Sequence, residues 1–446
     1  MTEAHMRKEK AVRRTKFAVA AALVAAAMLA AGCSSGSGST SSGGSAPVTL
    51  TIWHNYGTEQ NATALVNLAK AFHQLHPNIT VNVVSQPAPS YFALLQSRAI
   101  SRTGPDLAVM WTGLFTLQYK GFLQNLKGLV PASALAQIDP NALKWTSDGF
   151  NPANGPYVIP LENQFYIGFY NKADFAKAGV TSVPTDWSQL YAACTKLRKA
   201  GYTPLVYGNG GQPLGATFYP WYDMSYMMIG SYTVPQWLGL YSGATPWTAP
   251  AISAQLTKWN QLHSSGCTNS DVVTNTNNLG QFESGKAAMM VDGTWDTQKF
   301  TNALGSNVAA FAPPFSNTPI KGVVDFAGDG LSMMSYSPHK AQAAEFLTFM
   351  TTKQAAAIIN AAGLIPAING TSTTNPVNQQ MLNFVSQGGM TPYPMLDNVV
   401  QGNVVNIGSK YLPAVLNGSE SITKTLQAMQ TTQQQLPATQ RGNTFP

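Results

Sequence analysis

Charged side chains are scarce in this chain of 446 residues. Asp, Glu, Lys and Arg make up 10% of it, against roughly 25% in ordinary soluble domains, whereas hydrophobic residues make up 44%. Long apolar runs are scarce as well, because only residues 17–31 form an uncharged run long enough to be considered as a membrane span. The sequence therefore excludes a protein that crosses a membrane several times, and its apolar content excludes a disordered or collagen-like chain.

A basic surface for nucleic acid is also missing. The formal net charge is +7, but six basic and two acidic residues precede residue 17, so +4 of that charge belongs to the N-terminus. From Cys33 onward the chain has 20 basic and 17 acidic residues. No basic stripe remains that could release counterions from a phosphate backbone, and nucleic acid is not an expected partner.

The N-terminus has the three parts of a secretory signal. A basic region ends at Lys16, an apolar stretch runs from Phe17 to Leu29, and small residues lead to Cys33. The segment Leu-Ala-Ala-Gly-Cys resembles the bacterial lipobox, which implies cleavage before Cys33 and acylation of its thiol, for example with palmitate. We expect a lipoprotein signal peptide over residues 1–32 and a flexible Ser/Gly-rich tether over 33–47, the alternative being a plain secretory signal.

Cysteine is rare, with three in the chain. If Cys33 carries lipid, Cys194 and Cys267 remain as a candidate disulfide pair in an oxidising compartment. Closing a loop of about 72 residues would stabilise the fold by roughly 4 kcal/mol in the chain-entropy description. Two buried free thiols are the alternative. Two cysteines do not make a zinc site, so we expect neither a metal nor a cofactor.

The pattern after the tether is that of an α/β protein. Apolar residues alternate over Val48–Ile52 and again over Ile79–Val83, and helical spacing fills Thr58–His76 between them. Such a βαβ unit predicts a parallel sheet with a right-handed crossover. The apolar run 105–110 predicts a buried strand whose carboxyl end carries Trp111, and open α/β sheets bind ligands at such ends.

A second set of elements follows. We expect strands at 165–170 and 287–291, and helices at 188–200, 252–263, 341–350, 354–361 and 422–435. The segment 203–250 is crowded with Gly, Pro, Trp, Tyr and Met. It predicts loops and broken helices that present aromatic surface.

Several motifs resemble one family in their order along the chain. Leu-Thr-Ile-Trp-His at 50–54, followed by a helix that runs into 72–79, is similar to the opening of the family 1 extracellular solute-binding proteins, the carbohydrate-binding subunits of ABC importers. Further matches lie at 105–107, 157–160, 169–172, 183–187, 282–290, 293–295 and 340–350. The resemblance covers nearly all of residues 48–430.

The resemblance implies a two-lobed, periplasmic-binding-protein-like α/β fold. Each lobe is expected to be a mostly parallel sheet flanked by helices, with a hinge that the chain crosses several times and a ligand cleft between the lobes. The first lobe would hold residues 48–160 and 328–350, and the second 161–327 and 351–446. The implied function is that of a monomeric lipoprotein on the outer side of the cell membrane that captures a mono- or oligosaccharide and delivers it to an ABC transporter permease.

A sugar offers directional hydroxyls and flat CH-rich faces, so its site needs planar polar groups beside Trp or Tyr. The strongest candidate is Trp295, which the Gly-x-Trp motif of the family places at the cleft, and Asp296 follows it. The remaining candidates are Glu162, Asn163 and Gln164 at a lobe crossing; Trp53, His54, Tyr56 and Trp111 at strand ends; Trp221, Tyr222 and Asp223; Asp329; and Tyr393. For each, the alternative is a structural role in the core, the cleft wall, the hinge or a turn.

Other classes of protein were weighed against this interpretation. The chain has no Gly-x-Ser-x-Gly, phosphate-loop or His-Glu-x-x-His motif, and the family it resembles is not catalytic, so we do not expect an enzyme. A surface lipoprotein for adhesion or sensing would share the anchor, and a binding protein for another solute would share the fold. Many aromatic residues with few charges favour a neutral sugar.

Overall fold

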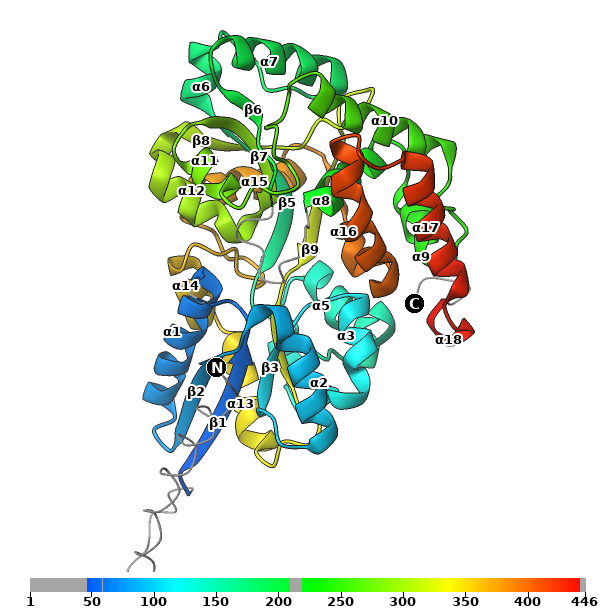
Figure 1. Cartoon of the computed structure of the whole chain (residues 1–446). Helices are drawn as coiled ribbons and strands as arrows, with labels where there is room; N and C mark the ends of the chain where they lie inside the picture. Colours follow the sequence, from blue (N-terminus) through cyan, green and yellow to red (C-terminus); the bar gives the residue numbers. More distant parts are fainter. Residues whose placement is uncertain (1–45, 58, 209–218, 442–446) are drawn as a thin grey trace, which may run out of the picture. The chain divides into compact units, whose positions relative to one another are not determined.

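The computed structural model describes residues 46–57, 59–208 and 219–441 (Figure 1). The chain divides into two units, 1–45 and 46–446, and the fold below belongs to the second. The predicted signal peptide and Cys33 lie outside the described residues. Across the described ranges, we find no helix that combines the length and the apolar character needed to cross a membrane.

The first lobe is built on a five-stranded sheet with the order β2-β1-β3-β10-β4. Its strands are β1 (Val48–His54), β2 (Ile79–Ser85), β3 (Leu107–Met110), β4 (Ile159–Pro160) and β10 (Gly330–Met333). β1 pairs in parallel with β2 and β3, whereas β10 runs antiparallel to β3 and β4. The expected mostly parallel sheet is confirmed, with one strand reversed.

Helices flank this sheet (Figure 1). They are α1 (Gln60–Leu75), α2 (Tyr91–Ser101), α3 (Leu114–Tyr119), α4 (Ala132–Leu135), α5 (Pro140–Thr146), α13 (Lys340–Met350) and α14 (Lys353–Ala361). α1 buries Leu65, Leu68 and Phe72, which recur at helical spacing on one face. The Phe72 ring meets the Phe346 ring of α13 edge to face at 5.1 Å between centroids, so α1 and α13 pack side by side.

The second lobe is built on a six-stranded sheet. Its path is β11-β9-β5-β7-β6, and β8 also pairs with β5. The strands are β5 (Asn163–Asn171), β6 (Thr203–Leu205), β7 (Ala287–Gly293), β8 (Val308–Phe311), β9 (Gly322–Ala327) and β11 (Thr391–Tyr393). β5 runs antiparallel to β7, β8 and β9, and the pairs β6–β7 and β9–β11 are parallel. Here too one reversed strand interrupts a sheet of otherwise common direction.

The helices of the second lobe include those predicted at 188–200, 252–263 and 422–435. They are α6 (Lys172–Lys177), α7 (Trp187–Lys199), α8 (Tyr219–Ile229), α9 (Val234–Ser242), α10 (Pro250–Ser264), α11 (Asn278–Glu283), α12 (Thr297–Leu304), α15 (Pro376–Ser386), α16 (Gly402–Leu416), α17 (Ile422–Gln435) and α18 (Ala438–Arg441). Short 3₁₀ turns include η5 (Thr294–Asp296) and η7 (Leu396–Asn398). Predicted helices and strands of this region lie within one or two residues of the observed ends.

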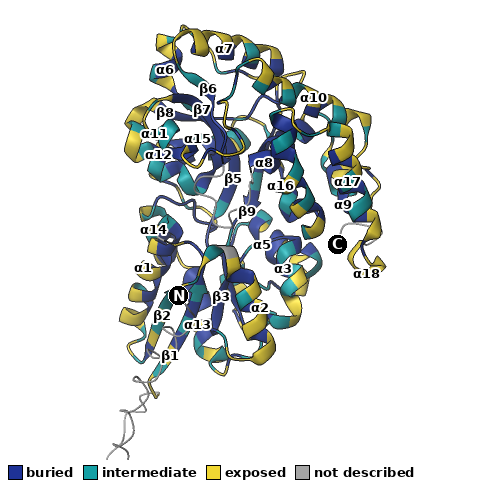
Figure 2. Ribbon diagram, in the orientation of Figure 1, coloured by how far each residue is buried: buried dark blue, intermediate teal, exposed yellow. Residues whose placement is uncertain are grey.

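The prediction of exposed aromatic surface over residues 203–250 is wrong. Trp221, Trp237 and Trp247 are all 0% exposed. α8 packs against α10, α16, β7 and β9, and therefore every side of this helix is covered. Figure 2 shows α8 in the colour of buried residues, surrounded by the exposed outer faces of α10 and α17. A helix that is apolar all round belongs in a core. The aromatic side chains here therefore pack in the core of the second lobe and do not form an exposed surface.

The chain passes between the two sheets at 160–163, at 327–330 and after α14. The three crossing segments are joined by backbone hydrogen bonds. Leu161 N donates to Asp329 O at 2.9 Å, Gly328 N donates to Glu162 O at 3.0 Å, and Asn163 N donates to Ile365 O at 2.8 Å. These bonds make the crossings one continuous hinge.

The last crossing lies later than the sequence predicts. α14 packs against α1 of the first lobe, whereas α15 packs against β8 of the second sheet. Residues 353–361 therefore lie with the first lobe, although the prediction assigned everything from 351 onward to the second. α13 and α14 are separated by only two residues, and this short gap gave no local sign that the chain stays in the first lobe until after α14.

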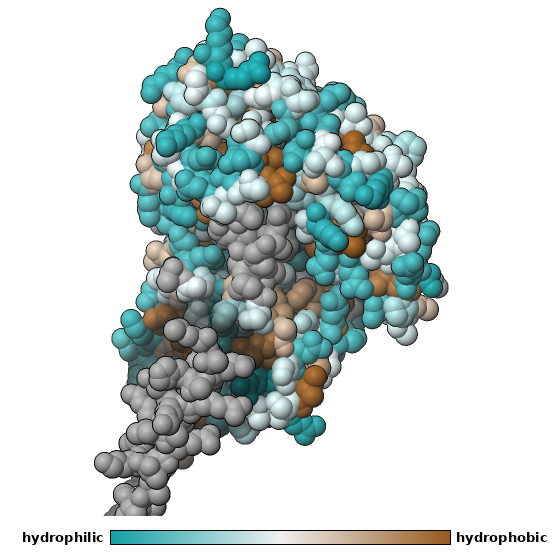
Figure 3. Space-filling view, in the orientation of Figure 1, coloured by the Kyte–Doolittle hydropathy of each residue, from teal (hydrophilic) through white to brown (hydrophobic). Residues whose placement is uncertain are grey.

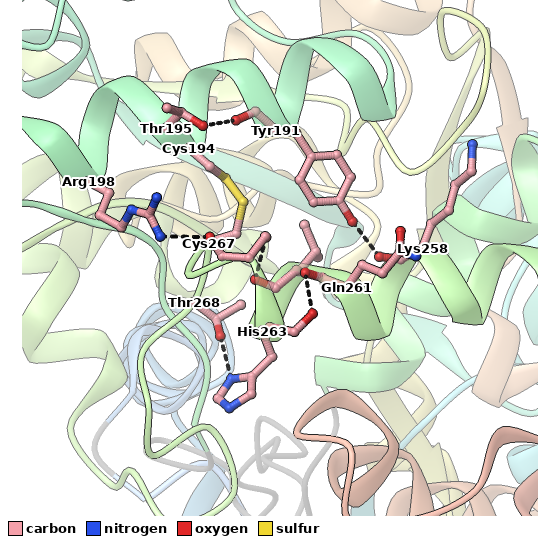
Figure 4. The surroundings of a disulfide bond; sticks show 12 residues. Tyr191, Cys194, Thr195, Arg198, Lys258, Gln261, His263, Cys267 and Thr268 are labelled. Carbon is pink, nitrogen blue, oxygen red and sulfur yellow. Dashed lines mark hydrogen bonds between the residues drawn. A yellow bond between two sulfur atoms is a disulfide. The ribbon is translucent and has the colours of Figure 1, made fainter.

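Cys194 and Cys267 form a disulfide in the structure. It joins α7 to the segment after α10 (Figure 4). Polar bonds also join α7 to α10 and to the residues after it: Tyr191 Oη donates to Lys258 O at 2.6 Å, and Arg198 Nη1 donates to Ser265 O at 2.9 Å. The sequence left free thiols open, and the structure has the bonded pair.

Candidate ligand site between the lobes

The strand ends of the first sheet carry several predicted site residues. β1 ends at His54, and the rings of His54 and Tyr56 stack at 5.7 Å between centroids. Tyr91 Oη donates to Trp53 O at 3.0 Å and to Val109 O at 2.9 Å, which ties the ends of β1 and β3 together. Trp53 and Trp111 are partly exposed, whereas His54 and Tyr56 are buried.

Trp295 of η5 is the best-held aromatic side chain of the second lobe. Its ring lies over Gly293, the last residue of β7, where an added Cβ would come within 2.1 Å of two ring carbons. Tyr166 and Tyr222 each meet the Trp295 ring edge to face at 5.9 Å between centroids. The indole remains partly exposed. Glycine at 293 is therefore needed for the ring to take this position.

Asp296 follows Trp295 in the chain and interacts electrostatically with Glu59, an acid of the first lobe. Burial raises the pKa of Asp296 to about 6, against the lowering effect of Lys299. Burial first, and then the charges of Asp296 and Glu162, raise the pKa of Glu59, just before α1, to about 7, against the lowering effect of Lys299. Because Glu59 and Asp296 belong to different lobes, their mutual repulsion shows that acids of both lobes approach one another.

Glu162 lies inside the hinge, with a side chain that is 0% exposed. Its Oε1 accepts hydrogen bonds from Gln164 Nε2 at 3.0 Å and from Asn61 Nδ2 of α1. Its Oε2 is buried with no hydrogen-bond partner among the described residues. Burial raises the pKa of Glu162 to about 7, and the two amide bonds act in the opposite direction. The predicted pair Glu162 and Gln164 thus meet each other.

Asp329 and Asp397 complete the acidic lining. Burial and the charge of Glu162 raise the pKa of Asp329. Asp397 of η7 accepts from Tyr166 Oη at 2.8 Å and 3.0 Å, and burial raises its pKa to about 6. The sequence prediction missed Asp397 and Glu59, because neither belongs to a local motif and only the fold brings them beside Tyr166 and Asp296.

Three predicted site residues lie within the second lobe instead. Trp221 is fully buried and its Nε1 donates to Ser409 Oγ at 2.9 Å. Asp223 Oδ2 accepts from Tyr207 Oη at 2.5 Å and from Trp259 Nε1 at 2.7 Å. Tyr393, on the edge strand β11, donates to Tyr232 O at 3.1 Å. Protein groups bind all three side chains, so we leave them out of the site proposed below.

The arrangement combines partly exposed aromatic rings with hydrogen-bonding carboxylates. Asn163 opens β5 beside this group and is partly exposed. Within the described ranges, we find no group of three or more His, Cys, Asp or Glu placed to hold a metal ion. Such a site can bind a ligand through ring stacking and through hydrogen bonds to acceptor oxygens.

Two lobes joined by a triple crossing, with polar and aromatic groups at the junction, define the class of two-lobed binding proteins. The chain matches the family described as bacterial extracellular solute-binding protein over residues 56–357. That match covers more than half of the sequence, and the chain belongs to this family. The location that the family implies is outside the cytoplasm.

Individual relatives are distant. The chain is 24% identical over 178 residues to the erythritol/L-threitol-binding protein of Mycolicibacterium smegmatis (strain ATCC 700084 / mc(2)155), a match that covers 37% of each chain. The curated relatives that it matches are covered over about 37% of their length.

Solved structures resemble the fold over nearly the whole described chain. A chitin oligosaccharide binding protein is 20% identical with a TM-score of 0.73, covering 86% of this chain and 98% of the other. The GacH receptor of Streptomyces glaucescens GLA.O, solved unliganded and with acarbose, is 19% identical with a TM-score of 0.70, covering 87% of this chain and 97% of the other. At these identities the similarity establishes the fold.

Proposed function

We propose that this protein binds a carbohydrate between its lobes and delivers it to an ABC transporter permease. The observation that carries the proposal is the position of Trp295, whose ring is held by Gly293, Tyr166 and Tyr222 at the junction of the lobes. A fixed, partly exposed indole can stack on the CH face of a sugar ring with little loss of side-chain entropy.

The carboxylates beside this ring supply the polar half of the site. Asp296, Asp329 and Asp397 are each partly exposed and present acceptor oxygens for hydroxyl donors. Glu59 reaches the same region from α1, so a bound ligand could bridge the two lobes and favour a closed form. The proteins of similar fold named above include binders of a chitin oligosaccharide and of acarbose, which supports a sugar as ligand.

Binding without catalysis is part of the proposal. The matched family consists of binding proteins, and the proposed role needs capture and release of an unchanged ligand. Incubating the purified protein with a bound sugar should leave that sugar intact. Hydrolysis above the buffer rate would contradict this part of the proposal.

Calorimetric titration against a panel of mono- and oligosaccharides tests the binding. We expect at least one sugar to bind, and Trp295→Ala to weaken it by about tenfold or more. Tyr191→Ala provides a control, because Tyr191 is a partly exposed aromatic residue on α7 beside the disulfide (Figure 4). Equal affinity in wild type and Trp295→Ala, or no binding of any sugar, would overturn the proposal.

Lipid anchoring at Cys33 is a separate part of the proposal and follows from the lipobox-like segment. Replacing Cys33→Ala in the full chain should move the protein from the membrane fraction to the soluble fraction of the cells. A protein that stays with the membrane after this change would argue against the anchor.

A further inference from the structure

A row of aromatic rings leads away from Trp111 along α3. Phe115 lies 4.9 Å from Trp111 between centroids, and Tyr119 lies 5.3 Å from Phe115 with ring planes within 21°. Phe115 and Tyr119 are four positions apart within α3, a spacing that keeps their side chains on one side of the helix, and Trp111 lies three residues before the helix begins. All three side chains are partly exposed. We call these three residues the aromatic row.

The ring of Phe92 in α2 packs against all three residues of the aromatic row. Its ring is nearly buried and meets Trp111 and Phe115 edge to face at 4.9 Å and 4.4 Å between centroids. It also reaches Tyr119 at 5.9 Å. A single buried ring thus contacts all three members of the row. Because these side chains are already ordered, little side-chain conformational entropy would be lost when a ligand stacks on them.

The aromatic row begins at the proposed ligand site. Met110, the residue before Trp111, pairs with Gly330 in the register of β3 and β10, which places Trp111 close to Asp329. Gly113 packs against the second lobe so closely that an added Cβ would lie 2.5 Å from Asn398 O, next to Asp397. Trp111 therefore stands between acids of both lobes, and the other two rings extend from it.

The surface near the outer end of the row is electrically balanced. Lys120 follows Tyr119, and its Nζ lies 3.3 Å from Asp148 Oδ1, so the two opposite charges neutralise each other. Figure 3 shows hydrophobic residues in small separate groups among hydrophilic and neutral ones on the face it displays. A neutral partner with flat apolar faces fits such a row better than a charged one.

We infer that the aromatic row binds additional sugar rings, so that the ligand is an oligosaccharide of three or more units and not a single sugar. This inference rests on the proposed function. A monosaccharide would need only the ring of Trp295 and the neighbouring acids. The exposed parts of Trp111 and of the stacked pair Phe115 and Tyr119 offer apolar ring surface beyond Trp295, on which the repeated CH faces of a sugar chain can pack.

Calorimetric titration with xylo-, malto- and chito-oligosaccharides of one to five units tests the inference. In wild type the affinity for the matching series should rise with each unit up to three or four. In Tyr119→Ala the gain from the longest ligands should fall by about threefold to tenfold, with the affinity for one and two units unchanged. Tyr119→Leu keeps apolar bulk and serves if the alanine variant folds poorly.

Tyr336→Ala is the matched control, because Tyr336 is a partly exposed aromatic residue beyond the far end of β10. It should keep the wild-type dependence on ligand length. Equal affinity for one and five units, or an equal loss for all lengths in both Tyr119 variants, would overturn the inference and leave the proposed function standing. Failure of every sugar to bind would overturn both.

Discussion

The side-chain amide of Asn61 in α1 donates a hydrogen bond to the carboxylate of Glu162 in the first lobe crossing. Both side chains are buried, at 1% and 0% exposure. The bond joins a helix of the first lobe to the segment in which the three crossings are hydrogen-bonded to one another. A titratable group therefore sits in the hinge itself.

The stability of the protein should depend on the protonation of Glu162. Its pKa is about 7 in the fold, against 4.5 for an ordinary glutamate. A raised pKa stabilises the fold fully below about pH 4.5, and this contribution is lost as the pH rises through 7. We expect the free energy of unfolding to fall with rising pH in wild type and to fall less steeply in Glu162→Gln. The two slopes should differ by up to about 1.4 kcal/mol per pH unit.

Urea unfolding between pH 4.5 and 8 measures this slope. Asp271→Asn, which changes an exposed acid that forms no ion pair among the described residues, should keep the wild-type slope. Parallel curves for wild type and Glu162→Gln would show that Glu162 does not titrate in this range.

Gly293→Ala should weaken ligand binding without contacting the ligand. The new methyl group would occupy the position of the Trp295 ring, 2.1 Å from its nearest carbons, and must displace it. We expect a loss of affinity of about tenfold and a shift in indole fluorescence. Gly121→Ala is the control, because an added Cβ there has nothing within 4 Å. An unchanged dissociation constant in Gly293→Ala would show that ligand affinity does not depend on the position of the Trp295 ring.

Asp223→Ala should destabilise the second lobe and spare ligand affinity. Removing the carboxylate leaves the Tyr207 hydroxyl and the Trp259 indole N–H buried without their acceptor. Each orphaned donor costs about 1–3 kcal/mol. Thermal unfolding should show a lower melting temperature, and titration of the folded variant should give a dissociation constant within about twofold of wild type. A large loss of ligand affinity in the folded Asp223→Ala variant would show that Asp223 contributes to ligand binding.

The disulfide should contribute to stability and not to binding. Replacing both Cys194 and Cys267 by alanine removes a cross-link between residues 73 positions apart. The chain-entropy description gives a loss of roughly 4 kcal/mol in the free energy of unfolding. Urea unfolding with and without reductant measures it, and reductant should have no effect on the double variant. A change in sugar affinity would be unexpected, because the bond joins α7 to the end of α10 and not the lobes.

Most of the fold could be predicted from the sequence, because strand alternation and helical spacing are local patterns. The place of the last crossing could not, since α14 and α15 are both amphipathic and only packing on α1 or β8 separates them. Aromatic richness in α8 was equally uninformative about exposure, because a core helix and a binding surface share that composition.

The site was predictable only where a motif carried it. Trp295 follows its glycine by two residues, and the structure shows why that spacing matters. Asp397 is 231 residues from Tyr166, to which it is bonded, and no pattern within either segment signals that contact. Long-range pairs of this kind appear only once the chain has folded.

The hydrogen bonds among the three crossings also restrict how the molecule can move. Segments tied side by side bend together but resist sliding past one another, so we expect the lobes to swing about one axis instead of shearing. A ligand too thick for the gap could then not be accommodated by a sideways shift. The hinge would in this way act as a gauge of ligand thickness.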